Sequence, residues 1–235
     1  MNDLFIKILS ITPNPLQVIG KCAGICWNAP VDEPEKNIKR AKECIESNHG
    51  RVLEFPDMTV VIDGPSARMM RELYTHIGGG PTRLQSSTRY VNEKDFKYYT
   101  PPSCQKDGVK EIYEEAMQHD AEVYRKLIEL GVPREDAANK LPLGMESKMV
   151  WKINLRALVN FFNRRLCTRA LKEIREFATA LKNTIAQVDE EWAWIAENLF
   201  VPSCEQYKYM NPALCFCAEK KGCGRHPYIK EWKAK

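Results

Sequence analysis

The stretch NLRALVNFFNRRLC, residues 154–167, predicts a helix with one unusual face. Winding it at about 100° per residue brings Leu158, Phe161, Phe162 and Arg165 onto one stripe. A guanidinium then stands where apolar packing is expected. Because an unpaired buried charge costs several kcal/mol, we expect Arg165 to meet an internal carboxylate, a bound anionic or carbonyl-bearing ligand, or a protein carbonyl at the helix end.

A second face of the same helix carries two polar side chains. Arg156 and Asn160 lie one turn apart, where neighbouring side chains can act together. Both offer hydrogen-bond donors. The pair suits a bound ligand and plain solvent exposure equally well.

Upstream, HIGGGPTRLQSSTRYV, residues 76–91, places three glycines and a proline before a strand-like run. In a strand, Gln85, Ser87 and Arg89 share one side, which has no apolar residue. That side is either a solvated sheet face or a site for a polar, phosphorylated ligand, since Ser and Arg are common phosphate partners. His76 falls on the apolar stripe of the preceding helix, a pattern typical of a core histidine.

Hydrophobic periodicity over the rest of the chain predicts an α+β fold, a mixed domain with a small central sheet and long helices. Gly and Pro end most of the expected elements. The segment 148–155 fits a strand or a helix by periodicity. The expected strands cover 4–11 and 57–65, and the expected helices cover 34–50, 65–79, 108–130, 133–140 and 168–198, the last with a break near 187–189.

The composition excludes several classes of protein. The 35 Lys and Arg residues and 31 Asp and Glu residues leave a net charge of +4, milder than the concentrated basic face of most nucleic-acid binders. No window approaches the ~18 apolar residues of a membrane span. The N-terminal run MNDLFIKILSITPNP is too short and too weakly charged for a secretory signal. We expect a cytoplasmic protein that binds neither membrane nor nucleic acid.

The chain changes character near residue 200, so we expect a domain over 1–200 and a Cys-rich tail over 201–235. The turn-rich sequence of the tail could bring together tetrahedral zinc ligands, but no pair of its cysteines has the Cys-x-x-Cys spacing. A structural zinc site, reduced thiols and an iron–sulfur centre remain alternatives. Cys22 and Cys26 are more typical of buried helix residues. The candidate ligands in the tail are Cys204, Cys215, Cys217, Cys223 and His226.

Several segments together resemble the flavin-dependent thymidylate synthases, over roughly residues 45–185. They are Glu54, Pro65, His76, QSSTRYV, GVPRE with the following LPL, WKINLRALVNFFNRR and KEIREFA, in the order seen in that family. The positions that match the family without a gap are Trp151, Asn154, Arg156, Asn160 and Arg165.

The signature loop departs from the family pattern. The family has Arg-His-Arg, seven residues and then Ser, whereas this chain has Thr75-His76-Ile77 and nine residues before Ser87. Arg83, on the inserted loop, is our candidate for a replacement cation.

Two further positions depart from the family pattern. Ala138 stands where the family usually has an Arg that reaches the nucleotide, and Lys140 is close enough to substitute. Glu72 falls where members often carry Gln.

The resemblance implies conversion of dUMP to dTMP, with methylenetetrahydrofolate as one-carbon donor and NADPH as reductant through bound FAD. It also implies a homotetramer with active sites shared between subunits. The implied flavin contacts are Glu54, His76, Asn154, Arg156, Asn160 and, by position, Arg83. The implied substrate contacts are Gln85, Ser87, Arg89 and Arg165, with Arg165 and Ser87 as catalytic residues.

Two other functions stay open. One is a related flavin enzyme that methylates C5 of another uracil nucleotide or uses another one-carbon donor. The other is a non-catalytic nucleotide- or RNA-binding module with a metal-binding tail.

Overall fold

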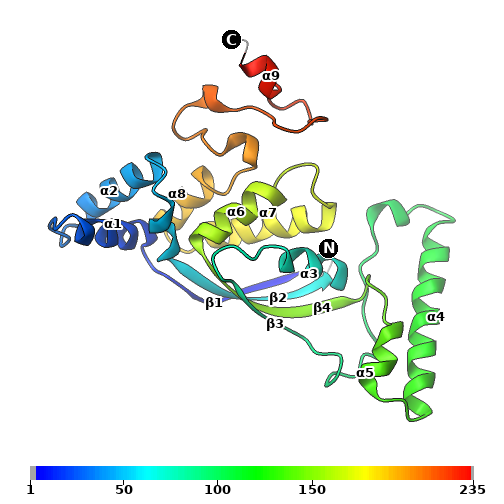
Figure 1. Cartoon of the computed structure of the whole chain (residues 1–235). Coiled ribbons are helices and arrows are strands. Elements are labelled where there is room, and N and C mark those ends of the chain that lie inside the picture. The colour runs from blue at the N-terminus through cyan, green and yellow to red at the C-terminus, as the bar shows by residue number, and fades with distance from the viewer. Residues whose placement is uncertain (1–3, 234–235) are drawn as a thin grey trace. The chain divides into compact units, whose positions relative to one another are not determined.

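The computed structural model describes residues 4–233, a mixed helix-and-sheet chain (Figure 1). Its contacts divide it into two compact units. Unit 1 comprises the residues up to Lys7, Val61–Thr75 and Arg83–Trp151, and unit 2 comprises Ile8–Val60, His76–Thr82 and the residues from Lys152 onward. The strands are β1 (Phe5–Ile11), β2 (Asp57–Ser66), β3 (Thr82–Gln85) and β4 (Glu146–Asn154). The helices are α1 (Pro15–Cys26), α2 (Pro34–Glu46), α3 (Ala67–Tyr74), α4 (Lys110–Glu129), α5 (Arg134–Ala137), α6 (Leu155–Arg165), α7 (Lys172–Ala186), α8 (Glu190–Asn198) and α9 (Ile229–Trp232).

The four strands form one antiparallel sheet in the order β1-β2-β4-β3. In β4 the side chains of Met149, Trp151 and Ile153 are buried, and those between them are more exposed. Alternation with a period of two is what a strand with one covered face requires. The segment that periodicity left ambiguous is therefore a strand as far as Asn154, and α6 follows it directly.

The core of unit 2 forms around the apolar stripe of α6. Phe161 packs edge-on against Phe177 of α7, with ring centroids 6.0 Å apart, and Phe162 stacks on Phe200 at 4.1 Å. Leu158 is also fully buried. Burying each phenylalanine contributes about 2 kcal/mol, so this stripe determines which face of α6 points inward. The helix expected over 154–167 is confirmed, with the shorter bounds Leu155–Arg165.

α3 is shorter than the periodicity predicted. Its start is capped by Ser66, whose Oγ accepts a hydrogen bond from the Met69 amide at 3.1 Å. Its end comes at Tyr74, so His76 and Ile77 do not continue the helical stripe, and Ile77 is 76% exposed. The glycines that follow explain the early end, because positive φ angles such as the +80° of Gly79 do not continue a right-handed helix.

The expected strand at 84–91 is also shorter. β3 ends at Gln85, and the amides of Tyr90 and Val91 both donate to the carbonyl of Ser87 in a turn. Ser-rich segments favour such turns because their side chains compete for backbone hydrogen bonds. The prediction that Gln85, Ser87 and Arg89 alternate along one strand was therefore wrong.

α1 places two cysteines differently from the prediction. Cys22 and Cys26 do lie on a helix, but Cys22 is half-buried and Cys26 is exposed. The buried face of α1 instead includes Leu16, Ile19 and Gly20. A Cβ added at Gly20 would lie 1.9 Å from the carbonyl oxygen of Asn37 on α2. The close approach of α1 and α2 therefore uses Gly20 and leaves both thiols off the contact.

α4, the long green helix of unit 1 in Figure 1, buries little of its surface. Of its 20 residues, Met117 and Tyr124 are buried, whereas Ile112 is 69% exposed. A helix in a packed protein normally buries an apolar stripe along its whole length.

Among the residues that the structure describes, no helix is long and apolar enough to cross a membrane.

Candidate functional site

Asn154 joins the start of α6 to the glycine-rich loop. Its side-chain oxygen accepts a hydrogen bond from the Ala157 amide at 2.9 Å, which caps the helix, and its amide nitrogen donates to the carbonyl of Gly79 at 3.1 Å. A Cβ at Gly79 would lie 2.9 Å from that same oxygen. The absence of a side chain at Gly79 thus lets the loop lie against the cap, and one asparagine determines its position.

Arg165, the last residue of α6, reaches back to the same loop. Its Nε donates a hydrogen bond of 2.9 Å to Nε2 of His76, and the imidazole lies edge-on to Phe161 at 5.2 Å. A ring nitrogen that accepts a hydrogen bond carries no proton. The sequence did not name His76 as a partner of Arg165. The bond orients the guanidinium.

The exposed face of α6 carries a second polar group. Arg156 donates from Nη1 to Oε1 of Glu54 at 2.6 Å, and the two side chains are 47% and 38% exposed. Asn160 is exposed on the same face, one turn further on. A surface ion pair of this kind contributes at most about 1 kcal/mol, so a ligand can displace it at little cost.

In unit 1, the segment after β3 is tied to neighbouring elements. Gln85 donates from Nε2 to Oγ of Ser147 on β4 at 3.0 Å. The Ser87 hydroxyl accepts the amide of Arg89 at 3.3 Å, and Arg89 pairs through Nε with Glu135 of α5 at 2.8 Å. The sequence did not indicate Glu135, because only the fold brings α5 to this turn.

The residues considered as replacement cations have protein partners. Arg83 lies in β3 and not on the inserted loop, with its guanidinium carbon 5.3 Å from the centroid of the Tyr74 ring. Burial lowers the pKa of Arg83, and the neighbouring Tyr74 partly offsets this. Lys140 lies 3.4 Å from Asp120 of α4. The role of either cation at a ligand stays a prediction.

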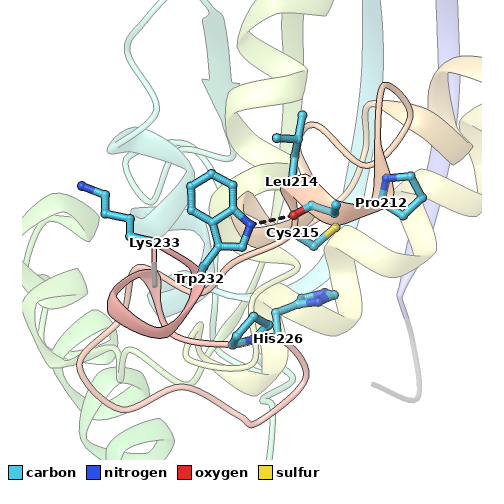
Figure 2. A pocket seen from close by; sticks show the side chains of 8 residues that line it. Pro212, Leu214, Cys215, His226, Trp232 and Lys233 are labelled. Carbon is cyan, nitrogen blue, oxygen red and sulfur yellow. Dashed lines mark hydrogen bonds between the residues drawn. The ribbon is translucent and has the colours of Figure 1, made fainter. Parts of the chain in front are cut away.

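The structure divides the five predicted metal ligands between two cavities of the tail. Cys215 and His226 line a cavity of about 700 Å³ beside Trp232, whose indole donates to the carbonyl of Ala213 at 2.6 Å (Figure 2). A smaller cavity is lined by Cys204, Cys217 and Cys223 together with Cys167, which the sequence prediction did not include.

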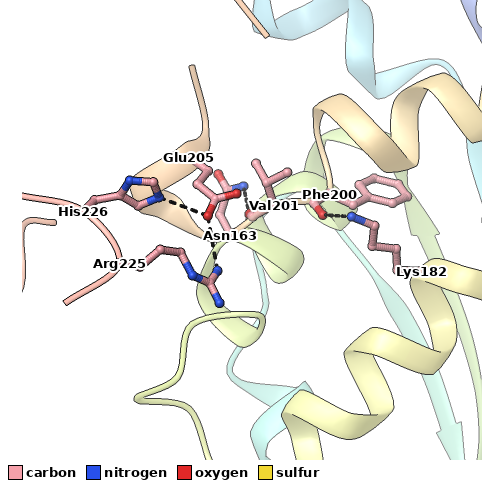
Figure 3. Close-up of polar contacts among 7 residues, drawn as sticks. All are labelled: Asn163, Lys182, Phe200, Val201, Glu205, Arg225 and His226. Carbon is pink, nitrogen blue, oxygen red and sulfur yellow. Dashed lines mark hydrogen bonds and ion pairs between the residues drawn. The ribbon is translucent and has the colours of Figure 1, made fainter. Parts of the chain in front are cut away.

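Within unit 2, polar contacts hold the start of the tail against α6 and α7 (Figure 3). Asn163 of α6 donates to the carbonyl of Val201 at 2.7 Å, and Lys182 of α7 donates to that of Phe200 at 2.9 Å. Burial lowers the pKa of Lys182, because the charged ammonium loses hydration there. These two bonds hold the backbone at Phe200 and Val201, which leads from the end of α8 into the tail.

Further along the tail, Glu205 accepts hydrogen bonds from His226 at 3.1 Å and from Arg225 at 3.2 Å (Figure 3). Burial raises the pKa of Glu205, but those two hydrogen bonds and nearby positive charge outweigh it and leave the pKa below its ordinary value. In the described part of the chain, the candidate ligand atoms that lie within 4.8 Å of one another are those of Cys204, Glu205 and His226.

Burial raises the pKa of the Cys204 thiol to about 11, with further contributions from Glu205, Cys167 and Cys217.

Comparison with known proteins identifies the family to which this chain belongs. The family described as thymidylate synthase complementing protein matches residues 7–190, and the chain belongs to this family. The chain is similar to three flavin-dependent thymidylate synthases. That of Clostridium tetani is 30% identical, over 85% of this chain and 87% of that protein. That of Pyrococcus abyssi is 34% identical, over 90% and 93%, and that of Nitratidesulfovibrio vulgaris is 29% identical, over 94% and 95%.

Proposed function

We propose that this protein is a flavin-dependent thymidylate synthase that converts dUMP to dTMP. In this proposal methylenetetrahydrofolate supplies the one-carbon unit and NADPH the reducing equivalents through FAD. Family membership over residues 7–190 carries the proposal. Residues 1–200 contain the catalytic machinery, and residues 201–235 form a tail outside it.

The donor set on α6 and its loop fits a flavin nucleotide. Arg156 presents an exposed guanidinium whose carboxylate partner is itself exposed, so a phosphate or a ring carbonyl can take over that contact. Asn160 adds an exposed amide one turn away. We assign FAD binding to Glu54, His76, Asn154, Arg156 and Asn160. When bound, FAD supplies the hydride.

The fixed position of Arg165 supports its catalytic role. Hydride addition at C6 of uracil builds negative charge over the C4, C5 and O2 region of the pyrimidine. A fixed guanidinium stabilises that charge, and the bond to His76 holds it before the substrate arrives.

We assign the substrate phosphate and base to the turn after β3. Arg89 is 65% exposed in its pair with Glu135, so its guanidinium can turn to a phosphate with little loss. Ser87 offers a hydroxyl on the same turn, and Gln85 an amide held by Ser147.

The exposure of α4 supports assembly into the homotetramer. Its Ile112 side chain is 69% exposed, and a second copy would bury it. We propose that active sites are shared between subunits, so that a monomer is inactive.

Tritium release from C5-labelled dUMP tests the function. Purified protein with FAD, NADPH and methylenetetrahydrofolate should release tritium from dUMP and not from UMP. Turnover of UMP alone would point to the related enzyme on another uracil nucleotide. Colourless protein that cannot take up FAD would instead favour the non-catalytic binding module.

A further inference from the structure

A thiol, a carboxylate and an imidazole meet in the tail, within unit 2. Cys204 and Glu205 lie on the single turn Ser203–Glu205, and His226 comes from the last loop, 21 residues beyond Glu205. One ligand atom of each residue lies within 4.8 Å of the other two. Sulfur, oxygen and nitrogen donors gathered this closely are suited to binding one metal ion.

α6 fixes the turn that carries two of these groups. The hydroxyl of Ser203 donates to the carbonyl of Asn163 at 2.9 Å. Just before the turn, the carbonyl of Val201 accepts from the side chain of the same asparagine at 2.7 Å. Cys204 and Glu205 therefore follow a stretch of backbone that is already held against the helix.

The neighbours of His226 in the sequence hold the imidazole beside this turn. On one side, the carbonyl of Pro227 accepts from the amide of Cys217 at 2.8 Å. On the other side, Arg225 donates from Nη1 to Oε1 of Glu205 at 3.2 Å. The side chains of Glu205 and His226 are 14% and 19% exposed, so both are largely withdrawn from water.

The spacing of the two groups is close to that of two ligands on one zinc ion. Zinc bonds to imidazole nitrogen and to carboxylate oxygen at roughly 2.0–2.2 Å, so two such atoms of a tetrahedral site lie roughly 3.4 Å apart. Nε2 of His226 lies 3.1 Å from Oε1 of Glu205, slightly less than that separation. A thiol next to an imidazole favours zinc over magnesium or calcium, which prefer oxygen ligands.

Cys204 also lines a small cavity with three other cysteines, which are Cys167, Cys217 and Cys223. The cavity holds about 20 Å³, room for about one water or one ion. Four thiolates on a tetrahedral zinc ion lie roughly 3.8 Å from one another. Over residues 4–233, no three of these sulfurs come within 4.8 Å of one another, whereas the group with Glu205 and His226 does. The mixed group is therefore the better-formed site.

We propose that Cys204, Glu205 and His226 bind one zinc ion. In the part of the chain that the structure describes, no fourth His, Cys, Asp or Glu joins the group, so water takes the fourth position. The thiolate and the carboxylate balance the two positive charges of zinc. The ion ties the last loop of the tail to the turn held by α6. The sequence did not indicate Glu205 as a ligand.

Metal analysis of the full chain tests the proposal independently of any activity. The protein is produced in zinc-supplemented cells and purified without a histidine tag, because such a tag binds zinc itself. After dialysis against metal-free buffer we expect about one zinc per chain. Protein that retains no zinc, or that holds iron and sulfide instead, would overturn the proposal.

Variants test the ligand set. His226→Gln and Glu205→Gln should each lose most of the zinc. Cys217→Ser is the matched control, because Cys217 lines the neighbouring cavity and should not be needed for the ion. Full zinc content in both ligand variants, or loss of zinc in Cys217→Ser alone, would show that cysteines around the cavity hold the ion instead.

Cobalt(II) added to the zinc-free parent protein gives an independent result in case the variants fail to fold. Tetrahedral cobalt absorbs red light, which oxidised flavin does not, and each thiolate ligand adds charge-transfer absorption. We expect a tetrahedral spectrum with the charge-transfer intensity of one thiolate. The intensity of several thiolates, or the weak spectrum of six-coordinate cobalt, would contradict the proposed ligands.

Discussion

Arg165 and His76 lie 89 residues apart in the sequence and are joined by a hydrogen bond of 2.9 Å. The bond connects the end of the helix that organises the core of unit 2 with the loop that departs most from the family signature. His76 contacts Arg165 in this chain, in which Thr75 and Ile77 stand at the positions of the two signature arginines. The positioning of Arg165 therefore does not depend on those arginines.

Replacing Arg165 tests its catalytic role. Arg165→Ala should lower kcat by about 10²–10³ because the charge that stabilises the substrate is removed. FAD should remain bound, as judged by the visible spectrum. Arg164→Ala is the matched control, since Arg164 is the exposed neighbour on the same helix turn. Full tritium release by Arg165→Ala would remove this residue from the mechanism.

Two changes at Asn154 separate its structural contacts. Asn154→Ala removes the cap of α6 and should reduce the free energy of unfolding by about 1 kcal/mol. Asn154→Asp keeps an oxygen for the Ala157 amide but loses the donor to Gly79. We expect near-normal stability in urea and weaker FAD binding for the Asp variant. Equal stability of all three proteins would show that the cap contributes nothing.

The exposed pair on α6 should matter for cofactor binding more than for folding. Arg156→Ala should weaken FAD binding about tenfold or more, because a charge-assisted hydrogen bond is lost. Its stability should change by less than about 1 kcal/mol. Lys152→Ala is the control, since Lys152 and Asp57 form a comparably exposed pair at 3.2 Å. Similar FAD titrations for both variants would contradict the assignment.

The turn after β3 should determine the affinity for the nucleotide. Arg89→Ala should raise the KM for dUMP about tenfold or more by removing a phosphate contact. Glu135→Gln should lower that KM slightly, because the competing carboxylate charge is removed. Arg125→Ala, which breaks the exposed pair with Asp95 in the same unit, serves as the control. An unchanged KM in Arg89→Ala would argue against a phosphate site here.

Glu93 should make stability depend on pH. Burial raises the pKa of Glu93 above its usual 4.5, so the folded chain holds this proton more tightly than the unfolded chain does. Stability from this group is therefore fully present below pH 4.5 and is lost as pH rises through the raised pKa. Glu93→Gln should gain stability relative to the parent across that window.

Urea unfolding at several pH values measures this difference. Glu115→Gln, an exposed position on α4, controls for the general loss of a carboxylate. A difference between parent and Glu93→Gln that stays constant with pH would show that the carboxyl group is not perturbed.

The sequence indicated most of the elements correctly where periodicity was long. The stripe of α6 and the break between α7 and α8 were predicted from spacing alone, because burial of one face imposes a 3.6-residue period. Prediction from the sequence was less reliable at 76–91, where glycine conformations ended α3 early and a turn at Ser87 ended β3 early. Local hydrogen bonds decide such segments, and side-chain patterning does not report them.

The order of residues along the chain thus determined the family, the amphipathic face of α6 and the types of side chain available for chemistry. Only the tertiary structure decided their partners: His76 for Arg165, Glu135 for Arg89, and Cys167 in place of Cys215 beside the other cysteines. The physical reason is that periodicity reports which side of an element is buried. A hydrogen bond or a group of ligands depends on which distant segments the packed core brings together.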